Sequence, residues 1–170
     1  MVETKTGKQI ATLQTSKGTI TFEPLPELAP EHVKNFVDLA RAGFYDGTKF
    51  HRVIPGFMIQ GGDPNTKTPN VTSWGTGNGP RRLKAEFSPA GRASHVRGIV
   101  SMARAADPDS ASCQFFVVHK DSTFLDNQYS IFGKVLTGME VVDAIANTPR
   151  DASDRPLQPV VIEKVTISGA

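Results

Sequence analysis

The chain has 170 residues, of which 38% are hydrophobic and 21% are charged. This length favours a single domain over residues 1–170, with residues 1–8 as a flexible N-terminal segment. The composition argues against disorder elsewhere. The 19 basic and 17 acidic side chains leave a formal net charge of +2. A dedicated nucleic-acid binder would carry a larger and more clustered basic excess, so nucleic acid is not the expected ligand.

Cysteine usage and the absence of long apolar runs indicate the compartment. The only cysteine is Cys113, so no disulfide can form within the chain, which suits the reducing cytosol. The first residues show no apolar signal-peptide core, and no apolar run has the length of a membrane span. We therefore expect a cytoplasmic protein without a membrane partner, and we take a monomer as the default.

The first half of the chain predicts a hairpin, a helix and a strand. Alternating residues over 9–25, with turn residues at 16–18, predict an N-terminal β-hairpin. Over residues 30–42, Val33, Phe36, Val37 and Ala40 follow helical spacing, and Gly43 supplies the stop. A strand is predicted at 50–54. The stretch 61–89, rich in Gly, Pro, Asn and Thr, predicts a structureless loop of functional importance.

The second half predicts mostly short strands, at 99–103, 115–118, 131–136 and 160–167. Between the last two, Thr137 and Glu140 have capping-box spacing, which predicts a second helix that begins near Thr137 and ends at Asn147. Many short strands with only two helices favour a closed antiparallel β-barrel. Because a small barrel is filled by its own side chains, a binding site would lie on its outer wall.

Five motifs in order carry the functional signal. The segment 50–63, FHRVIPGFMIQGGD, places Arg52 among large apolar residues, where an arginine alone would be read as a surface residue with a packed stem. It is followed by GIVSMA at 98–103, SCQFF at 112–116, FLD at 124–126 and FGKV at 132–135. Together these motifs resemble the cyclophilin-type peptidyl-prolyl cis-trans isomerases, over residues 9–167.

The resemblance implies a mainly β fold, a closed eight-stranded antiparallel β-barrel capped by two α-helices, and rotation of X-Pro peptide bonds to assist protein folding. It implies no cofactor and no metal. Arg52 would be the catalytic arginine, and Gln60 would support it and the substrate backbone. Phe57, Met58, Phe116 and Leu125 would form an apolar cup for the proline ring.

The same resemblance places further residues around the substrate. Ala103, Arg104 and Gln114 would line the groove beside the residue that precedes proline, with Arg104 presenting mainly its backbone. Gly75 would border the neighbouring pocket.

Two positions depart from the best-known eukaryotic cyclophilins. Phe124 stands where they carry tryptophan, and Tyr129 stands where many carry histidine. Both positions belong to the implied substrate site, and the pattern resembles the bacterial branch. Phenylalanine keeps the apolar wall but lacks the indole N–H donor. We therefore expect weak binding of cyclosporin without loss of isomerase activity.

Other interpretations have less support. His51, His95, His119 and Cys113 match no metal motif, and Cys113 is better explained as a small buried hydrophobe than as a nucleophile. Strand alternation would point His51 away from the side of Arg52, which favours packing over general-base catalysis. The glycines at 75, 77 and 79 lack the flanking elements of a phosphate loop.

The main alternative to an enzyme is a scaffold that holds proline-containing peptides without turnover. Retention of Arg52, Phe57, Gln60 and Phe116 together favours the enzyme, because a pure binder could lose the arginine and keep the cup. The expected partners of this protein are proline-containing segments of unfolded or flexible proteins.

Overall fold

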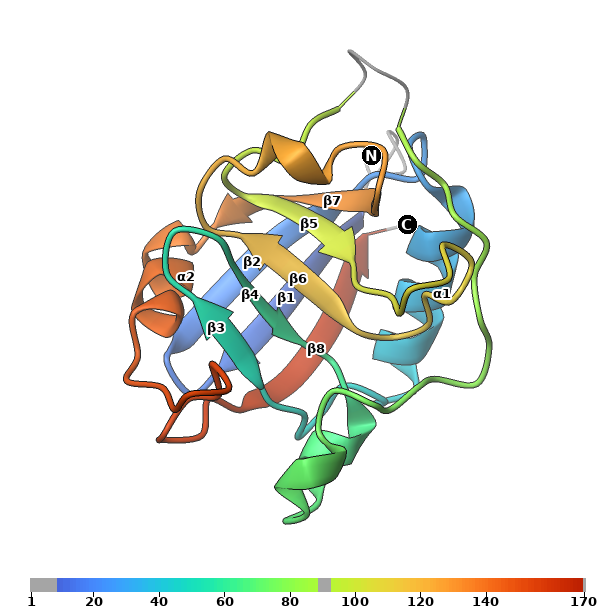
Figure 1. Ribbon diagram of the computed structural model, residues 1–170. Helices are drawn as coiled ribbons and strands as arrows, with labels where there is room; N and C mark the ends of the chain where they lie inside the picture. Colours follow the sequence, from blue (N-terminus) through green and yellow to red (C-terminus); the bar gives the residue numbers. More distant parts are fainter. Residues whose placement is uncertain (1–8, 89–92, 170) are drawn as a thin grey trace.

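The computed structural model describes residues 9–88 and 93–169, so the predicted flexible segment 1–8 lies outside the described residues. Eight strands and two α-helices make up the fold (Figure 1). The strands are β1 Gln9–Thr15, β2 Gly18–Pro24, β3 Arg52–Ile54, β4 Met58–Gly61, β5 Ile99–Met102, β6 Phe115–Val118, β7 Ser130–Thr137 and β8 Ile162–Gly169. The helices are α1 Pro30–Arg41 and α2 Met139–Ala146. The mainly β fold with two helices is therefore confirmed, and β4 is a strand that the sequence pattern did not predict.

The strands form one antiparallel sheet in the order β3-β4-β6-β5-β7-β2-β1-β8. The sheet curls so that its two edge strands approach each other. The backbone N–H of Phe50 donates to the carbonyl of Val160 at 3.0 Å, and the N–H of Ile162 donates to Thr48 at 2.7 Å. These bonds join the segment just before β3 to the segment that leads into the first residue of β8, and they do not form a ladder between the two strands. The structure thus shows an open, curled half-barrel, and the predicted closure is not confirmed.

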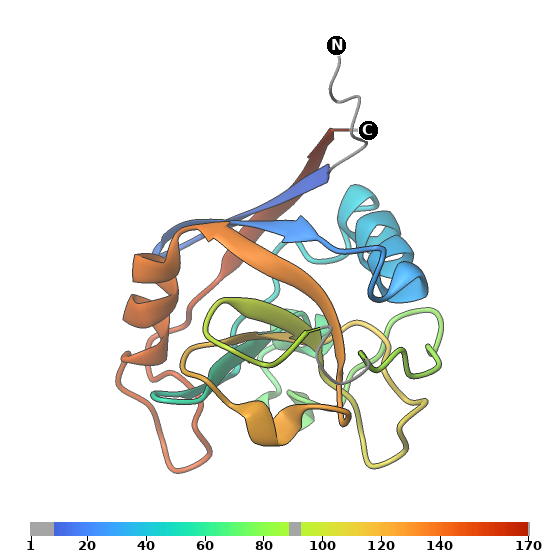
Figure 2. The same cartoon turned by 90° about the horizontal axis from the view of Figure 1, so that it is seen from above.

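The two helices lie at opposite ends of the curled sheet (Figure 2). Helix α1 packs against β7 and β8, and α2 packs against β2, β3 and β4. The predicted apolar stripe of α1 is buried throughout. Phe36, in the middle of that stripe, contacts the rings of Phe22, Tyr45, Phe115 and Phe132, with centroids 5.0–5.6 Å apart. The helical spacing was therefore a direct signal of core packing.

The start of α2 differs from the prediction. Thr137 is the last residue of β7, and its hydroxyl lies 2.7 Å from the hydroxyl of Thr21 on the neighbouring strand. Gly138, at φ +97°, makes the turn, and a Cβ there would lie 2.5 Å from the carbonyl oxygen of Thr19. The predicted capping box at Thr137 and Glu140 is wrong, because the Thr137 hydroxyl contacts Thr21 within the sheet and does not cap the helix.

Strand alternation divides the sheet into two apolar layers. On β4 and β6, Ile59 and Val117 point into the main core inside the sheet. Met58, Phe116 and Val118 belong to a second cluster on the outer side, together with Leu125 and Ile131. Strand β6 reads as a continuous apolar run because both of its faces are covered. This outer cluster supplies the floor of a surface site.

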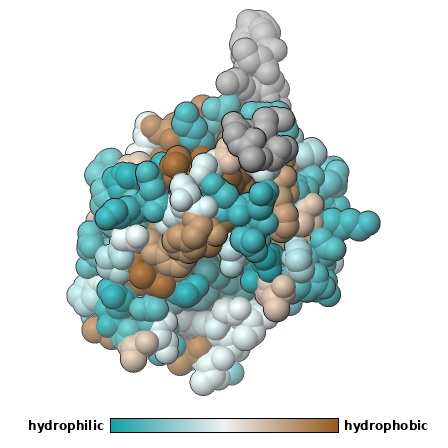
Figure 3. All heavy atoms as spheres, turned by 45° about the horizontal axis from the view of Figure 1, so that its top comes forward, coloured by the Kyte–Doolittle hydropathy of each residue, from teal (hydrophilic) through white to brown (hydrophobic). Residues whose placement is uncertain are grey.

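The outer surface is mostly hydrophilic in the view of Figure 3, with hydrophobic side chains gathered in local patches. Within the described residues, no helix has both the length and the apolar character needed to span a membrane.

Candidate active site

Strand register places three of the predicted site residues in one row across the outer face. Arg52 on β3 pairs with Gln60 on β4, and Gln60 pairs with Phe116 on β6. Arg52 is exposed, Gln60 is half-buried and Phe116 is buried. Directly opposite residues of an antiparallel sheet present their side chains on the same face, about 5 Å apart. A fixed cation, an amide and an aromatic ring therefore stand side by side.

A cavity of about 130 Å³ opens beside this row. Four of its nine lining residues, Arg52, Gln60, Arg104 and Tyr129, carry polar groups, and the other five are apolar. The lining consists of Arg52, Phe57, Met58, Gln60, Ala103, Arg104, Phe116, Leu125 and Tyr129. We call this space the proline cavity, because the family resemblance places the proline ring of a substrate among these residues.

Phe116 is held from behind by a polar chain that the motifs did not reveal. The ring of His95 stacks on Phe116 at 6.0 Å between centroids, with 17° between planes. His95 is fully buried, and its two ring nitrogens lie 2.9 Å from the Asp126 carboxylate and 2.9 Å from the Ser101 hydroxyl. Ser101 is also fully buried, so this Asp-His-Ser chain positions Phe116 and offers no nucleophile to a ligand. The sequence feature that could have indicated this chain is Ser101, a serine within the otherwise apolar strand β5.

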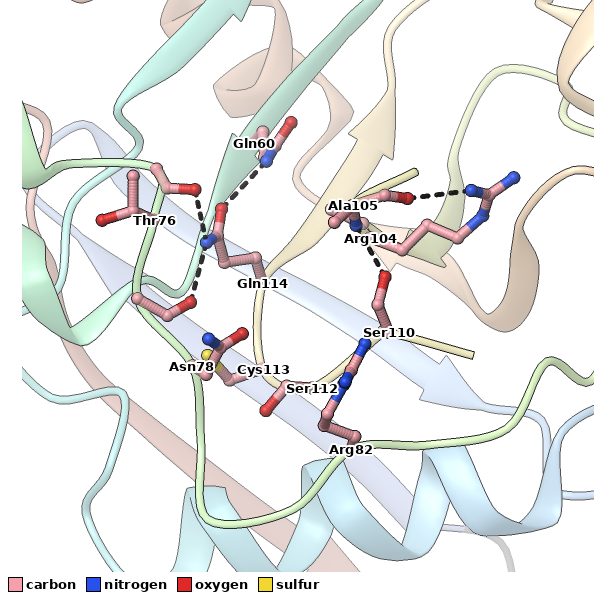
Figure 4. A pocket seen from close by; sticks show the side chains of 13 residues that line it. Gln60, Thr76, Asn78, Arg82, Arg104, Ala105, Ser110, Ser112, Cys113 and Gln114 are labelled. Atoms are coloured by element: carbon pink, nitrogen blue, oxygen red, sulfur yellow. Dashed lines mark hydrogen bonds between the residues drawn. The ribbon is translucent and has the colours of Figure 1, made fainter. Parts of the chain in front are cut away.

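A second, larger cavity of about 450 Å³ adjoins the first and shares Gln60, Ala103 and Arg104 with it (Figure 4). Gln114 braces its wall: its amide nitrogen donates to the carbonyls of Gly75 at 3.1 Å and Gly77 at 3.0 Å. Its amide oxygen accepts from Gln60 at 3.0 Å. We call this space the flanking cavity.

The stretch 61–89, predicted to be structureless, is mostly loop over the described residues 61–88, but two short 3₁₀ helices interrupt it. Short 3₁₀ helices occupy Pro64–Lys67 and Val71–Ser73. The buried Asp63 carboxylate accepts from the backbone N–H groups of Asn65, Gly75 and Gly77. One internal carboxylate thus replaces the hydrogen bonds that a strand or helix would provide.

The sequence matches a known protein family over most of its length. A model described as cyclophilin type peptidyl-prolyl cis-trans isomerase/CLD matches residues 10–167. The chain belongs to the cyclophilin family.

Known relatives are similar in sequence to this cyclophilin over most of its length. It is 42% identical over 161 residues to a probable peptidyl-prolyl cis-trans isomerase of Brucella abortus, covering 91% of this chain and 80% of the relative. It is 39% identical over 157 residues to peptidyl-prolyl cis-trans isomerase-like 3 of Dictyostelium discoideum, covering 92% and 93%. These relatives support peptidyl-prolyl cis-trans isomerase activity in this cyclophilin.

A solved structure gives the same fold. The cyclophilin-type isomerase of Cryptosporidium parvum superposes with a TM-score of 0.85 at 33% identity, over 96% of this chain and 99% of that one. A second crystal structure of that protein was determined in the presence of the dipeptide Ala-Pro.

The cyclophilin's predicted site residues divide between the two cavities, with one exception. Gly75 and Gln114 line the flanking cavity, and the other predicted residues line the proline cavity or both. Phe124 lines neither: it is 72% exposed, and its ring lies 5.6 Å between centroids from that of Phe57, tilted by 33°. It therefore packs against a residue of the proline cavity without lining the cavity itself.

The side chain of Arg104 packs across the site instead of pointing into it. Its guanidinium lies 4.9 Å from the ring centroid of Tyr129 and donates to the backbone carbonyls of Gln128 and Ala105. The position predicted to matter through its backbone thus also fixes the orientation of Tyr129.

Neither Cys113 nor His51 has the properties of a catalyst in this cyclophilin. Burial raises the pKa of the Cys113 thiol to about 12, so the thiolate is not available near neutral pH. His51 is buried while its neighbour Arg52 is exposed, as alternation predicted. Burial also lowers the pKa of His51, which keeps the ring neutral.

Lowered histidine pKa values predict a pH-dependent stability. Burial is the largest cause of the lowered pKa of His32, His51 and His95. Unfolded histidine titrates near pH 6.5, so below that pH the unfolded chain binds protons that the folded chain excludes. The free energy of unfolding should therefore be lower at pH 5.5 than at pH 7.5, as measured by urea denaturation. Exchanging His51 for glutamine should reduce this difference. Equal stability of the parent at the two pH values would contradict the assignment of buried neutral rings.

Proposed function

We propose that the isomerase activity resides in the proline cavity and that Arg52 drives it. The observation that carries this proposal is the position of Arg52, which is exposed and lines a cavity together with Phe57, Met58 and Phe116. Within residues 9–88 and 93–169, no acidic side chain pairs with it, so its donors are free to face a bound amide. Gln60, its partner across the strands, is itself held by Gln114.

The chemistry requires no bond to be made or broken. Rotation about an X-Pro bond is slow because amide resonance gives a barrier of about 18–20 kcal/mol. The resonance is lost when the lone pair of the proline nitrogen localises on that nitrogen. A hydrogen bond from Arg52 to the nitrogen would stabilise this twisted state more than the planar one, which is differential binding of the transition state. Arginine suits the task because it stays charged and offers several donors.

The apolar side chains of the proline cavity make the second contribution to catalysis, because they hold the substrate in place. Phe57, Met58 and Phe116 would hold the ring while the preceding carbonyl turns. Phe116 is suited to this because stacking on His95 and an edge contact with Tyr129, at 5.5 Å between centroids, leave it little freedom. A rigid wall fixes one side of the rotating bond without a further cost in side-chain entropy.

An isomerisation assay on a short X-Pro peptide separates an enzyme from a scaffold. We expect catalytic amounts of the protein to shorten the exchange between cis and trans isomers, which takes tens to hundreds of seconds unaided. A protein that binds the peptide without changing the exchange rate would be the non-catalytic scaffold instead.

Substrates are proposed to be exposed X-Pro segments of unfolded or flexible proteins, because the proline cavity opens on the outer wall. Four other expectations stay proposals: a single domain over residues 1–170, a closed barrel, a monomer, and residence in the cytoplasm. Closure is supported by the bonds that join residues 48–50 to residues 160–162.

Weak binding of cyclosporin is proposed from Phe124. This ring is exposed beside Phe57 and has no N–H donor, so exchange for tryptophan should add one hydrogen bond to a large ligand. We expect Phe124→Trp to bind cyclosporin about three- to tenfold more tightly, as measured by calorimetry. Phe124→Leu serves as the control without a donor and should not bind more tightly than the parent. Parent affinity equal to that of the tryptophan variant would contradict the proposal.

A further inference from the structure

The hydroxyl groups that line the flanking cavity are already hydrogen-bonded within the protein. The cavity lining includes Ser110, Ser112 and Gln114, which could in principle bind a peptide side chain. The Ser110 hydroxyl accepts from the N–H of Ala105 and donates to the carbonyl of Asp107. The Ser112 hydroxyl accepts from the N–H of Gly79 and donates to the carbonyl of Arg81. These hydroxyls therefore already have internal partners.

The amides and the remaining hydroxyl of the wall are occupied in the same way. Both donors of Gln114 are used by the carbonyls of Gly75 and Gly77, and its oxygen is used by Gln60. Thr76 donates to the carbonyl of Ser73 and accepts from the Asn65 amide. Across the described residues, the lining side chains that keep polar groups for a ligand are those of Gln60, Asn78, Arg82 and Arg104, and of these Arg82 and Arg104 are charged.

Arg82 brings the positive charge to this cavity. In Figure 4 its side chain extends toward Ser110 and Ser112, while the Arg104 guanidinium turns away toward Ala105. Arg82 has one acidic neighbour, Asp107, at 3.7 Å, and both side chains are more than 60% exposed. A pair this long and this exposed holds its partners weakly. No aspartate or glutamate lines the cavity among the residues described.

A bound peptide would reach this charge with a residue on the N-terminal side of proline. The proline cavity and the flanking cavity meet at Gln60, Ala103 and Arg104. The residue directly before proline would lie over this junction, and the next residue outward would enter the flanking cavity. A cavity with a cation, free donors and no carboxylate favours an anionic side chain and disfavours a cationic one.

We propose that this cyclophilin prefers substrates with an acidic side chain two residues before the proline, and that Arg82 determines the preference. This inference rests on the proposed function, since it assigns the specificity of the same site. Arg81 provides a matched contrast, because its guanidinium pairs with Glu31 on α1 at 3.2 Å and does not line the cavity.

The test uses three otherwise identical peptides with glutamate, glutamine or lysine two positions before proline. For the parent, we expect kcat/KM for the glutamate peptide to exceed that for the lysine peptide by about fivefold at low salt, the size expected for exposed charge pairs. The preference should shrink as ionic strength rises. Arg82→Gln should lose most of the preference, and Arg82→Glu should reverse it.

Arg81→Gln removes the same charge and should keep the preference of the parent. Equal kcat/KM for the three peptides with the parent protein would overturn the inference, and so would an equal loss of preference in the Arg81 and Arg82 variants. Failure of the parent to accelerate any of the three peptides is a different result, and it would contradict the proposed function itself.

Discussion

Replacing Arg52 with alanine is expected to lower kcat/KM for an X-Pro peptide by about 10²–10³-fold, the loss typical of removing one preorganised donor from an active site. The variant keeps the apolar wall, so the peptide can still bind, but nothing then stabilises the twisted amide. Because Arg52 is exposed at the end of a three-residue strand, its removal should leave the fold intact. The rate is measured by an isomerisation assay, and far-UV circular dichroism checks the fold.

Arg150→Ala is the control for the loss of a positive charge. Arg150 is partly exposed, pairs with Asp154 at 3.1 Å and lines neither cavity. We expect it to retain the kcat/KM of the parent within about twofold, because a surface pair contributes at most about 1 kcal/mol. A similar loss in both variants would show that net charge, and not the position of Arg52, sets the rate.

Two neighbouring phenylalanines of β6 should separate stability from activity. Phe115 is fully buried inside the sheet, with the rings of Phe36, Tyr45 and Phe50 at 5.5–6.3 Å between centroids. Phe115→Ala should lower the free energy of unfolding by about 3–5 kcal/mol, since it leaves a cavity in the core. The measurement is urea denaturation followed by circular dichroism.

Phe116 points to the outer face, where its ring forms one wall of the proline cavity. Phe116→Ala should cost less stability, about 1–3 kcal/mol, because the lost ring borders an opening to solvent. Its kcat/KM should fall by at least about tenfold, equivalent to about 1.4 kcal/mol of transition-state binding. If Phe116→Ala kept full activity, the ring would not belong to the proline site.

Local patterns in the sequence located the elements well. The stripe of Val33, Phe36, Val37 and Ala40 predicted α1 because a helix buries one face, and that face is what packs against the sheet. Alternation likewise predicted that His51 would be buried and Arg52 exposed. Capping-box spacing failed at Thr137 because the same hydroxyl is used by Thr21 across the sheet.

Contacts between distant segments could not be read from such patterns. Gln114 braces Gly75 and Gly77, and Asp126 orients His95 beneath Phe116. Each link joins residues more than 30 positions apart, and neither spacing nor composition encodes it. Motifs assigned Phe124 to the substrate site, and the structure shows it 72% exposed against Phe57 and lining neither cavity. Closure of the barrel depended on how far the sheet curls, which strand periodicity does not specify.

Measuring binding and rotation in the same sample separates the effect of Arg52 on peptide affinity from its effect on rotation of the X-Pro bond. Exchange spectroscopy by NMR gives both the affinity for an X-Pro peptide and the rate of cis-trans exchange on the protein. For Arg52→Ala, we expect binding within a few-fold of the parent and bound-state exchange slower by about 10²-fold or more. Exchange that stays within a few-fold of the parent at equal occupancy would contradict the proposed role of Arg52.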